Sequence, residues 1–369
     1  MNIILKNGLI VDYKNNFTKR ADVYIENGII KEISDSIIDR EASSLIIDCI
    51  GLVIVPGFID LYCKLDDERK IDVSRSSLYS AVMGGYTTLS VHGNYKNYEK
   101  NICEIIDIDE IKKNNTEMKY VLELTKDTGI NEGEIAKQID VDGVNPAEES
   151  IIISQCLIDS ERNNIPVFIN KITTKASVEL IRNAKKRGVK VFCSTCPHYY
   201  SFTVNSVLEA GVNAKTNPPL RTEEDRVAII QGIADGTIDC IVTDNTPISE
   251  EAKSIGIALA PNGIVGFETA LNSVLTSLIE IGKITYKDLV KLLSYNPAKI
   301  LGIDRGVIEV GKVADLVIFD PAREFVFSKE RMISTSKNTP WINKRLKGHV
   351  RYTIYNGKVV YERNKNLVK

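Results

Sequence analysis

Several polar and aromatic residues come directly after short apolar segments of this 369-residue chain, and their types could do chemistry. They are Tyr62 and Lys64, His92 and Asn94, Thr125, Asp140 or Asp142, Lys171, His198 and Asp244. Carboxylate and imidazole groups bind metal ions or move protons, whereas lysine ammonium groups only donate hydrogen bonds. What these residues can do together depends on the elements that position them.

The middle of the chain alternates apolar segments with helical patterns. The strand candidates are 53–60, 86–91, 119–124, 138–143, 166–171, 190–195 and 239–244. Between two of them, 177–187 predicts a helix with Leu180, Ile181 and Ala184 on one face and Val178 at its edge. Continuous apolar strands suit a parallel sheet that is covered on both faces. We therefore expect an α/β fold, a (β/α) TIM-like barrel whose chemistry lies at the carboxyl ends of the strands. The count of seven strands is one short of the usual eight.

The two ends of the chain share a different pattern. Asn27-Gly28 and Asn356-Gly357 follow apolar segments, and Asn-Gly between such segments is a strong hairpin signal. Neither end can bury a core alone, so we predict that 1–50 and 303–369 form one composite β-sandwich domain. The barrel then occupies 51–302.

Composition excludes several classes of protein. Lys plus Arg number 47 and Asp plus Glu 49, so the net charge of −2 argues against a nucleic-acid or membrane partner. No apolar segment is long enough to span a bilayer, and the N-terminus does not read as a signal peptide, so we expect a cytoplasmic protein. Seven scattered cysteines do not indicate a disulfide framework.

Ordered motifs along nearly the whole chain resemble one family. The segment 55–64, Val-Pro-Gly-Phe-Ile-Asp-Leu-Tyr-Cys-Lys, looks like the first-strand motif of the amidohydrolase superfamily. Motifs resembling those of dihydroorotases follow in the right order: Gly84-Gly85-Tyr86-Thr87-Thr88, Cys196-Pro197-His198-Tyr199, 215–221, 243–247, 263–269, Asn296-Pro297-Ala298 and Asn338-Thr339-Pro340. The resemblance implies a barrel of the metallo-dependent hydrolase type. It also implies reversible cyclisation of N-carbamoyl-L-aspartate to dihydroorotate in pyrimidine biosynthesis.

The chain departs from this family where the family binds one or two zinc ions. The two first-strand histidines are matched by Tyr62 and Lys64, and a further histidine is matched by Lys171. The unit that carries the remaining histidine has no evident counterpart, which agrees with one missing βα unit. An acidic ligand is matched loosely by Asp142, and Asp244 stands at the place of the catalytic aspartate.

These departures predict that no metal cofactor binds. Zinc needs about three or four imidazole, thiolate or carboxylate ligands, and an ammonium group has no lone pair to offer. Without metal, the hydrolytic water keeps a pKa near 15.7 instead of about 7. The remaining candidate site is a residual pocket. Asn94, Asn217, Pro261 and Gly263 stand at family substrate positions, while Asp66 replaces a substrate-binding arginine and Ile248 a histidine.

Individual residues keep alternative interpretations. Asp244 is either a residual catalytic base or the partner of Lys64 or Lys171. Those two lysines fill the pocket, unless one of them is carbamylated or forms a Schiff base. Cys193 and Cys196 have a C-x₂-C spacing but lack a second pair, so we interpret them as structural. His92 and His349 are interpreted as packing or surface residues.

Three functions remain open. The first is an inactive dihydroorotase-like pseudoenzyme that acts as a structural or regulatory partner. The resemblance implies the partner, the aspartate transcarbamoylase catalytic subunit, and a homodimer. The second is an active dihydroorotase or other cyclic amidohydrolase with an altered site. The third is a protein that binds a small molecule at the barrel mouth.

Overall fold

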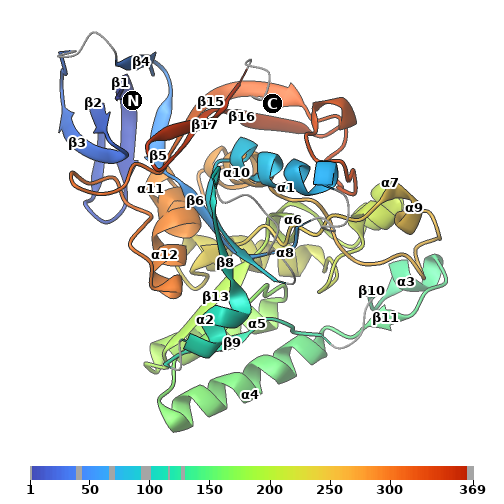
Figure 1. Ribbon diagram of the computed structural model, residues 1–369. Helices are drawn as coiled ribbons and strands as arrows, with labels where there is room; N and C mark the ends of the chain where they lie inside the picture. Colours follow the sequence, from blue (N-terminus) through green and yellow to red (C-terminus); the bar gives the residue numbers. More distant parts are fainter. Residues whose placement is uncertain are drawn as a thin grey trace.

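The two ends of the chain pair in one eight-stranded sheet of the computed structural model (Figure 1), which describes residues 2–38, 44–65, 71–92, 101–114, 117–125 and 129–363. Its strands are β1 (Ile3–Asp12), β2 (Phe17–Glu26), β3 (Ile29–Ser34), β4 (Leu45–Asp48), β5 (Val53–Pro56), β15 (Leu316–Val326), β16 (Arg345–Tyr355) and β17 (Lys358–Glu362). They lie in the order β17-β16-β15-β5-β1-β2-β3, with β4 beside β1. Strand β5 joins the ends because it pairs with both β1 and β15.

The predicted hairpins at both ends are present. Asn27 and Gly28 join β2 to β3, and Asn356 and Gly357 join β16 to β17, with positive φ at all four residues. A type I′ turn requires this conformation. Ile3 and Leu5 share one buried cluster with residues from the other end, so the two ends bury a common core. Whether the sheet folds over as a sandwich stays a prediction.

The barrel strands are parallel and form two separate sheets among the described residues. One sheet contains β6 (Phe58–Cys63), β7 (Tyr86–Val91) and β8 (Glu104–Asp107). The other contains β9 (Lys119–Val121), β12 (Val167–Ile169), β13 (Val191–Thr195) and β14 (Cys240–Ile241). At one seam the buried carboxylate of Asp60 on β6 accepts hydrogen bonds from Thr243 just after β14, so side-chain bonds replace a strand ladder there.

The structure corrects the predicted strands at three places. The segment 138–143 is not a barrel strand, because α3 (Glu134–Gln138) ends there and β11 (Gly143–Val144) pairs only with β10 (Ile130–Asn131). Strand β8 was not predicted, since its segment is short and only one of its four side chains is buried. The predicted strand 53–60 is two strands separated by Gly57, where a Cβ atom would lie 2.1 Å from Thr87 Oγ1.

Helices cover the outside of the barrel strands (Figure 1). They are α1 (Ile71–Met83), α2 (Ile108–Asn114), α4 (Ala147–Asn163), α5 (Lys175–Lys186), α6 (Pro197–Ser201), α7 (Ser206–Ala210), α8 (Glu223–Ala234), α9 (Glu250–Lys253), α10 (Ala270–Val274), α11 (Tyr286–Val290) and α12 (Asn296–Leu301). The 3-10 helices are η1 (Gly211–Ala214) and η4 (Lys329–Arg331), and two π-helical segments are η2 (Leu275–Ile279), which continues α10, and η3 (Lys291–Tyr295), which joins α11 to α12. None of the helices described is long and apolar enough to cross a membrane.

Helix α5 shows how local sequence sets these elements. The Thr174 hydroxyl caps its first turn by accepting a hydrogen bond from the Ser177 backbone N–H. Val178, Ile181 and Ala184 are buried, which confirms the predicted apolar face, while Leu180 is only partly buried. The capped helix begins directly after β12 and so fixes the strand end that carries Lys171.

Candidate functional site

The carboxyl ends of four barrel strands surround one cavity of about 360 Å³. Its lining consists of Tyr62, Lys64, Glu123, Lys171, Lys215, Asn217, Asp244, Thr246 and the loop 258–263. We call this cavity the barrel-mouth pocket. Parallel strands of a barrel place their chemistry at this end. Seven of the sequence-predicted residues line the pocket: Tyr62, Lys64, Lys171, Asn217, Asp244, Pro261 and Gly263.

A buried ion pair lies at the centre of the pocket wall. Lys171 Nζ is 2.9 Å from Asp244 Oδ1, and the two side chains are only 5% and 6% exposed. The same ammonium group donates to the carbonyl oxygen of Asn217 at 3.0 Å. Of the two lysines that the sequence left open as partners of Asp244, the structure therefore selects Lys171.

An aromatic ring covers the other side of this ammonium group. Lys171 Nζ lies 4.6 Å from the centroid of the Tyr62 ring, a cation–π geometry. The Tyr62 hydroxyl donates to Glu123 Oε1 at 3.1 Å, which holds the ring in place. Burial, together with the nearby charges of Asp244 and Glu123, raises the pKa of Tyr62 far above its usual range, so the phenol stays neutral.

Both members of the ion pair have strained backbones. Lys171 has a φ of 63° and Asp244 a φ of 52°, in the left-handed region that L residues other than glycine rarely occupy. Such strain persists only where the surroundings hold it in place, and it is frequent at functional sites. Here the Lys171 backbone N–H donates to Ser194 Oγ at 3.1 Å.

Each member of the ion pair stabilises the charged form of the other. Burial alone would lower the pKa of Lys171, but the carboxylates of Asp244 and Glu123 outweigh burial and raise it. Burial raises the pKa of Asp244, and the Lys171 ammonium opposes that rise. Lys171 is therefore protonated at neutral pH and has no free electron pair with which to attack a substrate or bind a metal.

The rim of the pocket is built from polar backbone groups and one further buried lysine. Lys215 Nζ donates to the carbonyl oxygens of Ala258 and Ala260, at 3.1 and 2.8 Å. Gly263 has a φ of 136° and donates its N–H to Lys215 O, and a Cβ atom at Gly263 would lie 2.6 Å from Thr246 Cγ2. Hydrogen bonds of the buried Lys215 to the rim backbone therefore fix the shape of the rim.

The sequence-predicted substrate positions divide into three groups. Asn217, Pro261 and Gly263 line the pocket, and Asn217 also accepts a hydrogen bond from Thr125 at 2.7 Å. Ile248 does not line the pocket; its backbone N–H donates to Asn338. Asn94 and Asp66 lie outside the described residues.

Sequence reasoning missed the two charged lining residues Glu123 and Lys215. Glu123 lies two residues before Thr125, which was taken as the end of the predicted strand. Its charge at the end of an apolar segment was the available signal. Lys215 opens one of the recognised motifs but was not singled out, because nothing local shows that its side chain is buried.

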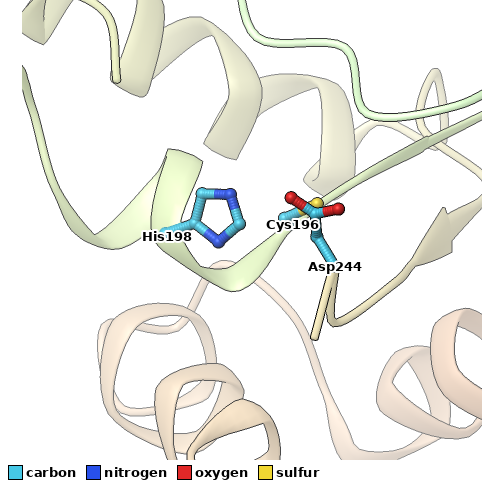
Figure 2. Close-up of side chains that lie close together, drawn as sticks. All are labelled: Cys196, His198 and Asp244. Atoms are coloured by element: carbon cyan, nitrogen blue, oxygen red, sulfur yellow. The ribbon is translucent and has the colours of Figure 1, made fainter. Parts of the chain in front are cut away.

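Two further donor residues, Cys196 and His198, lie close to Asp244 of the ion pair. Cys196, His198 and Asp244 each offer one ligand atom, and these atoms all lie within 4.8 Å of one another. Figure 2 shows the imidazole ring of His198 beside the side chains of the other two. Neither ring nitrogen of His198 has a hydrogen-bond partner in the described part of the chain.

These donors are of the types that zinc prefers, but the arrangement does not fit a metal ion. Asp244 already binds the Lys171 ammonium, so a divalent ion would lie next to a fixed positive charge. Burial and that same charge lower the pKa of His198 far below its usual value, so the imidazole is neutral and keeps its ligand electron pair, but the Lys171 ammonium would repel a cation bound there. Burial also raises the pKa of the Cys196 thiol well above its ordinary value, which opposes the thiolate that a metal requires.

Comparisons with known proteins agree on the family. The model of the amidohydrolase family matches residues 168–360. A dihydroorotase of Acetivibrio thermocellus is 36% identical over 422 aligned positions, which cover 97% of this chain and 98% of that protein. A dihydroorotase of Aquifex aeolicus is 34% identical, with 98% and 100% covered.

Solved structures show the same fold. The crystal structure of dihydropyrimidinase from Brevibacillus agri has a TM-score of 0.83 at 18% identity, covering 99% of this chain and 96% of that one. A D-hydantoinase has a TM-score of 0.83 at 21% identity, covering 100% and 96%. The fold is the TIM-barrel fold of metallo-dependent hydrolases, and this chain belongs to the amidohydrolase family, with dihydroorotases among its relatives.

Proposed function

We propose that this chain is a dihydroorotase-like protein of pyrimidine biosynthesis that does not perform metal-dependent hydrolysis. The 2.9 Å contact between Lys171 Nζ and Asp244 Oδ1 carries this proposal. It places a protonated amine on the carboxylate that stands where the family's catalytic aspartate does. Tyr62 and Lys64, at the first-strand positions of the family's histidines, line the same pocket.

The chemistry explains why this contact matters. Reversible closure of a cyclic amide needs a polarised carbonyl group and a nucleophile that is active near neutral pH. A bound metal ion would polarise the carbonyl group as a Lewis acid and would lower the pKa of water from 15.7 to about 7. In this chain Asp244 is neutralised by Lys171, so it cannot act as a free base for the same step.

The decisive experiment measures metal and turnover together. We expect the purified protein to carry far less than one metal ion per chain by elemental analysis. We expect no conversion of dihydroorotate or N-carbamoyl-L-aspartate in either direction, with or without added zinc. Stoichiometric zinc with turnover that Asp244→Asn abolishes would overturn the proposal.

An active dihydroorotase is the second candidate. The relatives are themselves dihydroorotases, and this favours activity more than it favours an inactive role. The grouping of Cys196, His198 and Asp244 is a second observation in its favour. The experiment above separates the two candidates.

A third candidate is a binding protein that uses the barrel-mouth pocket. About 360 Å³ suffices for a small metabolite, and the walls carry both positive and negative groups. A thermal-shift screen of metabolites tests it, because a ligand at 100 times its dissociation constant stabilises the fold by about 2.7 kcal/mol. No shift with any small cyclic amide or ureido acid would count against this candidate.

The inactive role requires a partner, and we propose the aspartate transcarbamoylase catalytic subunit, with this chain as a homodimer in the cytoplasm. The resemblance to dihydroorotases is the support for this. Mixing the two purified proteins should give co-elution and a change in transcarbamoylase activity. Independent elution with unchanged activity would remove the role.

We also propose that one βα unit of the family barrel is missing. The alignment with the Acetivibrio thermocellus relative spans 422 positions, more than the 369 residues of this chain, so it contains long gaps on this side. The described barrel strands also do not close into one sheet.

A further inference from the structure

Four arginines gather at one end of the C-terminal strands, far in sequence from the barrel-mouth residues. They are Arg323 in β15, Arg331 in η4, Arg351 in β16 and Arg363 just after β17, and we call them the arginine cluster. The Arg363 backbone N–H donates to Arg351 O at 2.9 Å, which ties two of them together.

An aromatic contact ties His349 to the same group. Arg331 Cζ lies 5.1 Å from the centroid of the Phe325 ring. The ring of His349 lies 4.3 Å from that of Phe325, centroid to centroid. His349 is thus packed beside the cluster, which refines its interpretation as a packing residue.

The cluster lacks the carboxylate partners that most other arginines of the described chain have. Six arginines elsewhere in the described chain have a carboxylate oxygen within 4.0 Å: Arg182, Arg187, Arg221, Arg226, Arg305 and Arg345. Within the described residues, none of the four members of the cluster forms such a pair. Like charges at close range repel each other, so an arrangement of this kind is costly without an anion.

Two of the acidic groups near the cluster, Asp320 and Glu268, are already used. Asp320 accepts hydrogen bonds from the backbone N–H groups of Ala322 and Arg323. Glu268 is buried and accepts from the Ser80 hydroxyl and from the backbone N–H of Ser334. Both carboxylates therefore serve the backbone and neighbouring side chains rather than the guanidinium groups.

A small cavity lies within the cluster. Arg331, Arg363 and His349 line it together with Glu268, and its volume is about 20 Å³. That space holds about one atom of the size of a water oxygen. The Nε2 atom of His349 is buried and has no hydrogen-bond partner in the described part of the chain.

The positive charges act on the groups around this cavity. Burial and then the charges of Arg363, Arg331 and Arg323 lower the pKa of His349 to about 4, while Asp320 opposes this only weakly. Burial and the other members of the cluster likewise lower the pKa of Arg363. The arginines are thus close enough to His349 and to one another for their charges to act on these groups.

We propose that the arginine cluster binds the phosphoryl group of a small molecule, with one oxygen in the cavity beside His349 and the others facing the guanidinium groups. Planar guanidinium groups donate paired hydrogen bonds to phosphate oxygens, and several of them match a double negative charge. The site is independent of the barrel-mouth pocket, so it stands whatever the activity of that pocket.

Phosphate and sodium triphosphate are the probes that test this site. We expect both to raise the melting temperature of the wild-type protein above that in sodium chloride of equal ionic strength. Arg323 and Arg331 are exposed, so the double variant Arg323→Gln/Arg331→Gln should fold. It should bind either probe about tenfold more weakly or worse, since two charge-assisted contacts are removed.

Arg345→Gln is the matched control. Arg345 lies in the same sheet but is paired with Glu324, so its loss should leave probe binding unchanged. Tighter binding of triphosphate than of phosphate would indicate that the site takes more than one phosphoryl group, and equal binding that it takes one; both outcomes support the proposal. An equal response in chloride, or an unchanged response in the double variant, would overturn it.

A second readout does not depend on stability. The chain has only three histidines, so the proton resonance of His349 can be assigned by comparison with His349→Asn. Saturating triphosphate should raise the pKa of His349, because the anion offsets the arginine charges. A titration curve of His349 that is the same with and without triphosphate would contradict the placement of an oxygen beside this ring.

Discussion

Two buried ion pairs lie in the same barrel and differ in what surrounds them. Arg221 and Glu149 are 2% and 0% exposed, with their charged atoms 3.6 Å apart. Lys171 and Asp244 are nearly as buried but border the barrel-mouth pocket. The first pair faces only protein, whereas the second faces a space that a ligand can enter.

Hydrogen bonding shows the difference in detail. Glu149 accepts from the backbone N–H groups of Thr173 and Thr174, and Arg221 donates to Thr173 Oγ1 and Asn131 Oδ1. That network connects α4, the β10–β11 ribbon and the segment after β12.

Asp244, by contrast, is paired with the Lys171 ammonium. Both residues of this pair, which we call the mouth pair, have a strained φ. The enclosed network stabilises the fold through many hydrogen bonds, although Arg221 Nη2 forms none with the described residues, while a strained pair at a cavity indicates a site shaped for binding.

We expect the largest loss of stability when the buried Arg221–Glu149 pair, the enclosed pair, is broken. Glu149→Leu should lower the free energy of unfolding by about 3–5 kcal/mol, because it leaves the Arg221 charge buried without a partner. Urea denaturation followed by circular dichroism measures it. Glu161→Gln, also on α4, removes an exposed pair with Arg187 and should cost less than about 1 kcal/mol. Equal losses for the two variants would contradict the assigned role of Glu149.

A smaller loss is expected at the pocket. Asp244→Asn should lower the free energy of unfolding by about 1–3 kcal/mol, since water in the pocket can partly solvate the Lys171 ammonium. Adding Lys171→Met to Asp244→Asn should recover part of this loss, because the unpaired charge is then gone. A loss as large as that of Glu149→Leu would show that water does not reach the Lys171 ammonium any more than it reaches Arg221. The proposed difference between the two pairs would then be wrong.

A third buried carboxylate, Asp60, has hydrogen bonds but no cation, which predicts a pH dependence. Burial raises its pKa from 3.8 to about 7 in the folded protein. The folded state therefore holds this proton where the unfolded state has released it, so the contribution of Asp60 to stability is full below pH 3.8 and is lost as the pH rises toward 7. The difference in unfolding free energy between wild type and Asp60→Asn should fall over this range. A difference that is constant or rises would contradict the assignment.

The sequence predicts most of the architecture because its signals are local. Asn27-Gly28 specifies its turn through its own backbone preferences, and the helix at 177–187 is evident from apolar spacing. The barrel strand predicted at 138–143 was wrong because the short apolar pattern of this segment, taken alone, suits a strand. Its true pairing, of β11 with β10, depends on a neighbour that periodicity does not reveal.

The site was predictable in position but not in its contacts. Tyr62, Lys171 and Asp244 stand at strand ends, which a parallel barrel brings together. Nothing local in the sequence shows that Lys171 rather than Lys64 binds Asp244, or that Lys171 has a left-handed φ. The arginine cluster was not predicted, because its members come from four separate segments that meet only in the folded sheet.

The smallest expected effect separates the two functions of Tyr62. Tyr62→Phe removes the hydroxyl that donates to Glu123 but keeps the ring 4.6 Å from the Lys171 ammonium, so it should cost less than about 1 kcal/mol. Tyr62→Leu also removes the ring and should cost about 1–2 kcal/mol more, since both packing and a desolvated cation–π contact are lost. Thermal and urea unfolding of the two variants measure the difference. If Phe and Leu cost the same, the ring does not stabilise the ammonium, and the mouth pair depends on Asp244 and Asn217 alone.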